Sequence, residues 1–589
     1  MTDLRRLLSQ ALSSALDAAC PDHPVAAPTV GPCQDPRFGD YQSNAAILAA
    51  AALKRPPREL AEAVVGALKA ESLCAKVEVA GPGFINFHLL PFRIAALLSE
   101  MADDPCCGIP PAEKPKRIVV DFSSPNTAKA MHVGHIRSTF LGDALARIAR
   151  AVGHEVITDN HLGDWGTQFG MLIHGYRRFL DREAEKKDPV TEFERLYRLV
   201  SAQAEAEAST REAARRELAA LHAGDPENLR IWKEIADLSF TEFEKTYRRL
   251  GVRFDHHLGE SFYNPQLPGV VEELCRLGIA EESEGAVCIF FRNDPALKDV
   301  APMIVRKKDG AFLYATTDLA TVRHRVREWK AEEMLYVTDA RQQLHFKQVF
   351  SAAARWAAAP GNTLLPSLDA RPPALRHIVF GTILGADKKP IKTRTGNPIK
   401  LTDLLDEAES RALGMIEERN PELTPSARPA AARAIGIGAV KYADLSQNRN
   451  LDYVFDWKKL LALQGNTAPY LIYAYVRIRS IFRQDGAAEA ATEALETTSV
   501  LSHETELALA KKLIQFGDAV HSVLDDCRPH LLANYLYDLA TRFSRFYEAC
   551  PVLKAPEPER AARLFLCGLT ARTLRRGLDL LGIETIEEM

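Results

Sequence analysis

Two histidines three positions apart, His132 and His135, suggest chemistry on a phosphate group. They lie at the predicted start of a helix, where free backbone N–H groups and the helix dipole favour an anion. Gly134 stands between them and, having no Cβ, lets a flat ring approach the backbone. The pair could instead bind a metal, although no Asp or Glu adjoins it, or consist of two buried structural histidines. Spacing alone leaves these three interpretations open.

A βαβ unit is predicted around the pair. Residues 116–122 are typical of a strand, and residues 123–126 (Ser-Ser-Pro-Asn) end it. Apolar residues then recur with a 3.6-residue period from 136 to 152, which predicts a helix, and 154–160 predict a second strand. Such a unit implies a parallel sheet with its ligand site at the carboxyl ends of the strands. The sequence contains no G-x-x-x-x-G-K-[ST] motif, and the nearest G-x-G-x-x-G match, at 436–441, lacks its third glycine.

The composition is that of a soluble globular protein of several domains. The chain has 589 residues, of which 47% are hydrophobic and 26% charged. The net charge is 74 − 78 = −4, so any binding of nucleic acid must rest on local groups of residues. None of the ten cysteines has C-x-x-C spacing, which favours reduced thiols over zinc ligands. The longest apolar run, 45–53, is too short to cross a membrane, and the N-terminal residues lack the pattern of a secretory signal, so we expect a cytoplasmic protein.

Three domains are predicted. Residues 1–108 indicate an N-terminal α+β domain, which ends at a break rich in proline around 104–111. Residues 116–430 indicate a Rossmann-like α/β domain with helical insertions, mainly at 180–250. Residues 431–589 indicate an all-α helical bundle. Further strand-like runs lie at 286–291, 303–306, 312–315, 334–338 and 376–384.

Several segments carry a family resemblance. The string DFSSPNTAKAMHVGHIRSTFLGDAL (121–145) resembles the H-I-G-H region of class I aminoacyl-tRNA synthetases, and of arginyl-tRNA synthetases in particular. Further similar segments lie at 161–170 (HLGDWGTQFG), 313–320 (LYATTDLA), 336–345 (YVTDARQQLH), 392–401 (KTRTGNPIKL) and 463–481. The resemblance extends from about residue 30 to the end. It implies an enzyme that activates arginine with ATP and transfers the arginyl group to the 2′-hydroxyl of the terminal adenosine of tRNA(Arg).

The resemblance also implies the phosphate-binding residues. His132, Gly134 and His135 match the H-I-G-H element. The family's second element, K-M-S-K-S, is represented by Lys392-Thr393-Arg394-Thr395-Gly396, in which the second lysine is missing near Thr395. In many arginyl enzymes a lysine ahead of the H-I-G-H element takes its place, so we expect Lys129 to contact the phosphates, with Lys392 and Arg394 assisting and Thr395 binding ATP. Lys129 could otherwise be an ordinary solvated lysine. We expect ATP with Mg²⁺ as the substrate complex and no zinc or organic cofactor.

Arginine recognition requires carboxylates for the guanidinium, together with an aromatic or hydrogen-bonding partner. Tyr314 and Asp318 are four residues apart and would project together from a helix. Either residue alone is more typical of core packing or of a helix cap. The arginine-binding residues implied by the resemblance are Asp121, Ser124, Asn126, His135, Tyr314, Asp318 and Gln342.

The predicted RNA contacts lie in the outer domains. Residues 435–589 have a charge of 18 − 20 = −2, so this region is no general polyanion binder. The best candidate for an RNA contact is the helix predicted from Thr467 to Arg483. One line on it holds Tyr470, Tyr473, Arg477 and Ile481, and a more apolar line holds Leu471, Tyr475, Ile478 and Phe482. The first line could stack on unpaired anticodon bases, or both lines could be buried. Phe84 and Asn86 match the family's contacts to the elbow of the tRNA.

We therefore expect an arginine–tRNA ligase that acts as a monomer on L-arginine, ATP and tRNA(Arg), with no membrane partner. Two alternatives remain at this point: a class I synthetase for another amino acid, and a catalytically inactive paralogue that binds tRNA.

Overall fold

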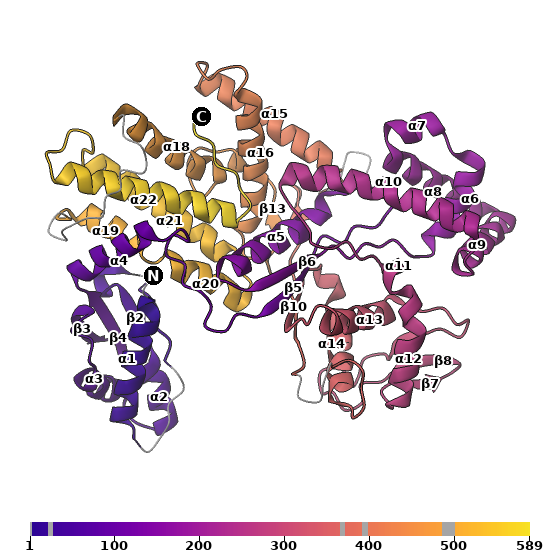
Figure 1. The fold of residues 1–589 in the computed structure, drawn as a ribbon, viewed down its shortest axis with the longest axis horizontal. Coiled ribbons are helices and arrows are strands. Elements are labelled where there is room, and N and C mark those ends of the chain that lie inside the picture. Colours follow the sequence, from indigo (N-terminus) through magenta and orange to yellow (C-terminus); the bar gives the residue numbers. More distant parts are fainter. Residues whose placement is uncertain (1–2, 22–27, 34, 366–370, 392–398, 486–500) are drawn as a thin grey trace. The chain divides into compact units, whose positions relative to one another are not determined.

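The computed structural model describes residues 3–21, 28–33, 35–365, 371–391, 399–485 and 501–589 (Figure 1). Its contacts divide the chain into two compact units. The first to be described comprises Lys114–Met415 and Ala439–Leu460 and holds the candidate site. The other comprises Met1–Glu113, Ile416–Gly438 and Leu461–Met589.

A parallel sheet of four strands in the order β11-β10-β5-β6 forms the centre of the first unit. Asp121 pairs in register with Asp159 on one side and with Tyr336 on the other, so these three residues end neighbouring strands at the same edge. The predicted βαβ unit is confirmed, with β5, α5 and β6 following one another along the chain. The bounds are β5 (Arg117–Asp121), α5 (Ile136–Ala151), β6 (Glu155–Asp159), β10 (Glu333–Tyr336) and β11 (Ala374–His377).

The helix α5 packs directly on the turn that follows β5. A Cβ atom at Gly142 would lie 2.1 Å from Cγ of Phe122, so only glycine allows this approach. Gly153, with φ +88°, ends the helix in the left-handed region and returns the chain to the sheet. The contact fixes the start of α5, and with it the two histidines, relative to the carboxyl end of β5.

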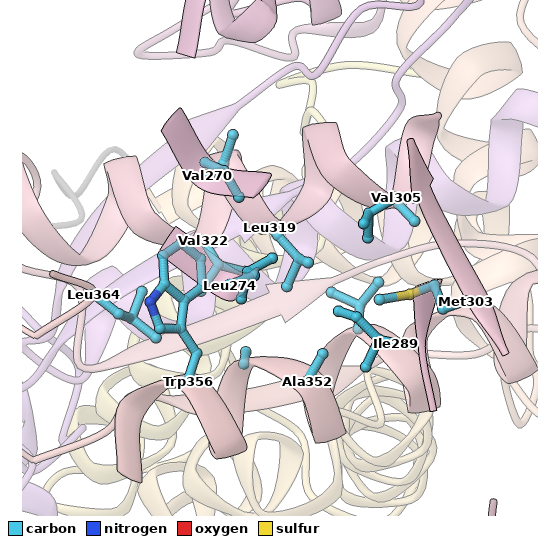
Figure 2. Packing of buried hydrophobic residues seen from close by; sticks show 14 of the residues in the cluster. Val270, Leu274, Ile289, Met303, Val305, Leu319, Val322, Ala352, Trp356 and Leu364 are labelled. Atoms are coloured by element: carbon cyan, nitrogen blue, oxygen red, sulfur yellow. The ribbon is translucent and has the colours of Figure 1, made fainter. Parts of the chain in front are cut away.

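A second hydrophobic core lies among the helices α12, α13 and α14 and the three-stranded sheet β7-β8-β9 (Figure 2). Trp356 is fully buried in it, and its indole N–H donates to Glu273 Oε1 at 2.9 Å. The predicted strand at 312–315 is wrong, because α13 begins at Tyr314 and continues the 3.6-residue pattern that follows. The elements are α12 (Leu267–Arg276), β7 (Glu281–Ser283), β8 (Ala286–Ile289), β9 (Met303–Arg306), α13 (Tyr314–Arg327) and α14 (Gln343–Ala358).

Five helices form the predicted helical insertion and lie together in Figure 1. Four of them, α6, α8, α9 and α10, share a hydrophobic core that includes Phe169, Leu172, Phe193 and Leu196. The helices are α6 (Gln168–Phe179), α7 (Arg182–Lys187), α8 (Pro189–Ala206), α9 (Ala208–His222) and α10 (Pro226–Leu250). The short elements of this unit are α11 (Glu260–Tyr263), β12 (Ile383–Leu384), β13 (Tyr453–Val454) and α17 (Trp457–Leu460). Two long helices, α15 (Leu401–Arg419) and α16 (Arg428–Leu445), continue from one unit into the other.

The other unit joins the N-terminal α+β region to the C-terminal helices. Tyr41 Oη donates to Asp518 Oδ2 at 2.7 Å, and Arg572 donates to the carbonyl of Asp104 at 3.1 Å. The N-terminal elements are α1 (Leu4–Ala19), α2 (Ala45–Leu53), α3 (Pro57–Ala67), α4 (Pro91–Asp103) and an antiparallel sheet in the order β1-β2-β4-β3, with β1 (Gly31–Pro32), β2 (Tyr41–Ser43), β3 (Cys74–Ala80) and β4 (Phe84–Leu89). The C-terminal helices are α18 (Ala468–Asp485), α19 (Glu504–Leu513), α20 (Phe516–Asp526), α21 (His530–Ala549) and α22 (Glu559–Leu580). Of the helices in the described ranges, none has the length and apolar character needed to cross a membrane.

Candidate active site

His132 and His135 lie in the short helical turn Val133–His135, immediately before α5. His132 Nδ1 accepts the N–H of Gly134 at 3.0 Å, and His135 Nδ1 accepts the N–H of His132 at 3.0 Å. The ring centroids are 4.1 Å apart. Because both Nδ1 atoms accept hydrogen bonds, the proton of each neutral ring is on Nε2, which is left to donate to a ligand.

Burial keeps these rings uncharged. Desolvation, reinforced by the neighbouring His132, lowers the pKa of His135 to about 3. Burial also lowers the pKa of His132. At neutral pH the pair therefore offers two preorganised N–H donors without adding positive charge.

Gly134 has a more local role than the sequence suggests. A Cβ at this position would lie 2.7 Å from Cε1 of His132, so the flat ring that approaches the backbone is the ring of His132 itself. Gly134 is exposed, and its lack of a side chain allows the hydrogen bond that orients His132.

Residues 399–401 pair through their backbone with the segment that contains His132. Val133 N donates to the carbonyl of Ile399 at 3.0 Å, and Leu401 N donates to the carbonyl of Met131 at 2.9 Å. This backbone pairing anchors the end of the 385–400 segment beside His132. The residues predicted to assist there, Lys392, Arg394 and Thr395, lie outside the described residues.

Tyr314 and Asp318 project together from the first turns of α13 toward α14. His345 Nε2 donates to Asp318 Oδ2 at 2.5 Å, and the ring centroids of Tyr314 and His345 are 4.7 Å apart. Tyr314 is exposed, whereas the Asp318 side chain is only 18% exposed. A half-enclosed carboxylate thus lies beside an accessible aromatic ring, as recognition of a guanidinium requires.

A second carboxylate, which sequence reasoning missed, belongs to the same environment. The pKa of Glu260, at the start of α11, is raised to about 7, chiefly by burial; the nearby His161 opposes this rise, and the negative charges of Asp164 and Asp318 contribute to it. Glu260 and Asp318 therefore interact electrostatically although they are 58 positions apart in sequence. No local pattern marks Glu260, because its significance arises only when α11 packs against α13.

The remaining predicted arginine-binding residues are spread along the edge of the sheet. Asp121 is buried and already paired, since Arg325 donates to its Oδ2 at 2.7 Å and Ser124 Oγ donates to its Oδ1 at 3.2 Å. This internal pairing differs from the expected contact of Asp121 with substrate. Asn126 is exposed and pairs through its backbone with Gly163.

Gln342 is also exposed, in the turn Ala340–Gln342 between β10 and α14. Its neighbour Arg341 affects the pKa of His132, which links the segments after β5 and β10 electrostatically. The histidine pair and the partners of Asp318 thus follow the carboxyl ends of neighbouring parallel strands, where ligands of such sheets bind. In the described part of the chain, no three His, Cys, Asp or Glu side chains are grouped so that they could hold a metal ion.

The predicted RNA-contacting residues differ in exposure. Tyr473 and Arg477 are exposed on α18, and the Arg477 guanidinium lies 4.6 Å from the ring centroid of Tyr547. Tyr470 is half-buried. Ile481 is buried and does not continue the exposed line as expected, because the line turns into the bundle there. The second line, Leu471, Tyr475, Ile478 and Phe482, is buried throughout.

In the N-terminal sheet Phe84 is half-buried. Asn86 is fully buried, and its Oδ1 accepts a hydrogen bond from Gln42 Nε2 at 2.8 Å. The side chain of Asn86 therefore exposes no surface for the expected RNA contact, although Asn86 alternates with the core residues Ile85 and Phe87 and so lies on the same face of β4 as Phe84.

Comparison with known proteins identifies all three regions. The family models that match are "tRNA synthetases class I (R), catalytic domain" at residues 101–457, "DALR anticodon binding domain" at 471–589 and "Arginyl tRNA synthetase N terminal domain" at 2–89. The chain is 45% identical to an arginine–tRNA ligase of Chromobacterium violaceum over the full length of both, and 44% identical to one of Synechococcus elongatus over 100% of this chain and 99% of that protein.

Solved structures agree with this result. The arginyl-tRNA synthetase of Thermus thermophilus is 26% identical, with a TM-score of 0.84, and that of Plasmodium falciparum is 26% identical, with a TM-score of 0.83; each comparison covers 100% of both chains. The predicted fold class, an α/β parallel-sheet domain between an N-terminal α+β domain and a C-terminal helical bundle, is confirmed. The chain belongs to the arginyl-tRNA synthetase family of class I aminoacyl-tRNA synthetases, ligases that join arginine to tRNA.

Proposed function

We propose that this chain charges tRNA(Arg) in two steps, with the arginine guanidinium held between Asp318 and Glu260 and the ATP phosphates held by His132, His135 and Lys129. In the first step a carboxylate oxygen of arginine attacks the α-phosphorus of ATP, which enters as its magnesium complex. The bond to the bridging oxygen breaks, and diphosphate leaves with the electron pair. In the second step the 2′-hydroxyl of the terminal adenosine attacks the arginyl carbonyl, and AMP leaves.

The observation that carries this proposal is the half-enclosed Asp318 carboxylate, which shares the neighbour His345 with the accessible Tyr314 ring and lies within electrostatic range of a second carboxylate, Glu260. A guanidinium presents five N–H donors in one plane, and bidentate acids match that geometry. Glu260 is strongly desolvated and is repelled by Asp318. An amino acid whose side chain has no positive charge, or is too short to reach the two carboxylates, would leave this repulsion uncompensated, so the site favours arginine.

The phosphate side needs positioning more than covalent chemistry. The N–H donors of His132 and His135 are fixed by backbone hydrogen bonds before the substrate binds, so they need no reorganisation in the transition state. Lys129 is exposed and supplies the positive charge that the neutral histidines lack. We extend to Lys392, Arg394 and Thr395 the assisting roles implied by the sequence.

We assign the exposed Tyr473 and Arg477, with Tyr470, to the anticodon contact, and Phe84 to the contact with the tRNA elbow. We also propose a cytoplasmic enzyme that acts as a monomer, which size-exclusion chromatography with light scattering would test.

The substitution Asp318→Asn tests the arginine pocket. Loss of one partner of a desolvated charge pair costs about 2–5 kcal/mol, so the KM for arginine in pyrophosphate exchange with tRNA present should rise roughly 30-fold or more. The KM for ATP should stay within a few-fold. Asp309→Asn, in an exposed loop, is the matched control and should change neither constant. An arginine KM unchanged in Asp318→Asn would refute the assignment.

A further inference from the structure

Three consecutive residues ahead of the histidine pair are each held by a side chain of the helical insertion. Ser239 Oγ on α10 accepts the N–H of Ala128 at 3.0 Å. Glu194 Oε1 on α8 accepts the N–H of Ala130 at 2.8 Å. Between them, the ammonium of Lys129 lies 5.7 Å from the ring centroid of Tyr197, also on α8.

The held segment has a strained backbone. Ala128 has φ +60° although it is not glycine, and Ser123 and Ser124, earlier in the same connection, have φ +72° and +48°. Left-handed conformations of this kind persist only where the surroundings impose them. Ser239 can impose one because it is fully buried and its own hydroxyl donates to the carbonyl of Ile235 at 2.6 Å, which fixes the lone pair that Ala128 uses.

The contact with Tyr197 restrains Lys129 without neutralising it. A carboxylate partner would compete with phosphate for the ammonium, whereas the face of an aromatic ring attracts the cation and leaves its N–H donors available. Within the described ranges no carboxylate forms an ion pair with Lys129. Glu194 is engaged elsewhere, since Arg198 lies 3.3 Å from its Oε2 while its Oε1 binds Ala130 N.

We propose that the helical insertion of residues 168–250 positions Lys129 for the ATP phosphates, with Tyr197, Glu194 and Ser239 as positioning residues. The inference rests on the proposed phosphate role of Lys129 and assigns to the insertion a part in adenylate formation. Tyr197 limits where the ammonium can be, and Glu194 and Ser239 fix the backbone on either side of it. None of the three touches substrate.

A double-mutant cycle between Tyr197 and Lys129 tests this coupling. The rate of arginyl-adenylate formation is measured by pyrophosphate exchange with full-length protein, tRNA and saturating arginine. Tyr197→Leu should lower the rate about 3- to 30-fold, the range for losing a cation–π contact. Tyr197→Phe keeps the ring and should retain the wild-type rate. In a Lys129→Ala background, Tyr197→Leu should cause no further loss, because the group that it positions is gone.

Two further variants separate positioning from general stability. Glu194→Gln keeps an oxygen acceptor for Ala130 N and should remain near wild type, whereas Glu194→Ala should lower the rate with an unchanged KM for arginine. Tyr176→Leu removes another cation–π contact within the insertion, in which Arg182 lies 5.0 Å from the ring, and should leave the rate of the folded enzyme unchanged. Thermal unfolding of each variant checks that it is folded.

The outcomes distinguish this inference from the proposed function. If Tyr197→Leu lowers the rate equally with and without Lys129, or does not lower it at all, the inference is overturned while arginine-dependent exchange stands. If exchange with wild-type protein does not require arginine, the proposed function itself fails. If Lys129→Ala forms adenylate at the wild-type rate, Lys129 does not act on the phosphates, and the positioning proposed for the insertion is refuted as well.

Discussion

The guanidinium of Arg325 lies 2.7 Å from the carboxylate of Asp121. The same nitrogen, Nη2, lies 2.7 Å from Oδ2 of Asp159, the register partner of Asp121 on the neighbouring strand. All three side chains are buried or nearly so, and the two acids end adjacent parallel strands, where their charges would repel each other. Arg325 therefore makes the carboxyl edge of the sheet stable before any substrate binds.

The variant Arg325→Met should destabilise the protein strongly. It leaves two buried carboxylates without a cation, and breaking a buried ion pair from one side costs about 3–5 kcal/mol. Urea unfolding of the full chain measures the loss. Adding Asp159→Asn to Arg325→Met should recover part of it, because one of the unmatched charges is removed. Arg327→Met, at an exposed position of the same helix, should cost well under about 1 kcal/mol.

The raised pKa of Glu260 should make arginine binding depend on pH. With a pKa of about 7 in the free enzyme, the carboxyl is mostly protonated at pH 6 and mostly ionised at pH 8. Only the ionised form pairs with a guanidinium, so the KM for arginine should fall about tenfold between pH 6 and pH 8. Binding at pH 7 should release protons, which calorimetry in buffers of different ionisation enthalpy would detect.

Two variants show whether Glu260 is the titrating group. In Glu260→Gln the KM for arginine should be raised and nearly independent of pH over this range. In Asp318→Asn it should be raised but should still depend on pH, because Glu260 remains. A pH dependence that survives in Glu260→Gln would assign the titration to another group.

The secondary-structure elements that position the histidine pair could be predicted from the sequence alone. The strand, histidine pair and helix at 116–152 were predicted because a buried strand and a long 3.6-residue period are strong local signals, and β5 and α5 confirm them. The strand predicted for the four-residue run 312–315 is wrong. So short an apolar run does not distinguish a strand from the first turn of a buried helix.

Residues that matter through distant contacts could not be predicted. Glu260, Arg325 and Tyr197 stand in ordinary helical sequence, and each gains its role from a partner more than 50 positions away. Asn86 shows the converse, since a matching motif suggested a surface contact and the structure buries the side chain. A single sequence records neither the partner nor the burial.

The neutrality of His135 should appear in the pH dependence of stability. Its pKa is about 3 in the folded protein and ordinarily 6.5, so between these values the unfolded chain binds the extra proton. The contribution of neutral His135 to the free energy of unfolding is therefore fully present above about pH 6.5 and decreases as the pH falls below that value. Between pH 7 and pH 5 the wild type should lose about 2 kcal/mol more free energy of unfolding than His135→Asn. Equal losses in the two proteins would contradict a desolvated His135.

The exposed residues of α18, Tyr473 and Arg477, should contribute to tRNA affinity but not to the rate of adenylate formation. Tyr473 is 45% exposed, while Leu471 and Tyr475 beside it are fully buried, so its ring is free to stack on a base. Stacking contributes about 1–3 kcal/mol per base, so Tyr473→Ala should weaken binding of tRNA(Arg) by roughly 5- to 150-fold in a filter-binding assay. Tyr473→Phe keeps the ring and should bind normally. At saturating tRNA, adenylate formation by Tyr473→Ala should match the wild type, because the residues proposed to bind arginine and ATP belong to the other unit. A binding loss below twofold would mean that α18 does not read unpaired bases through this ring.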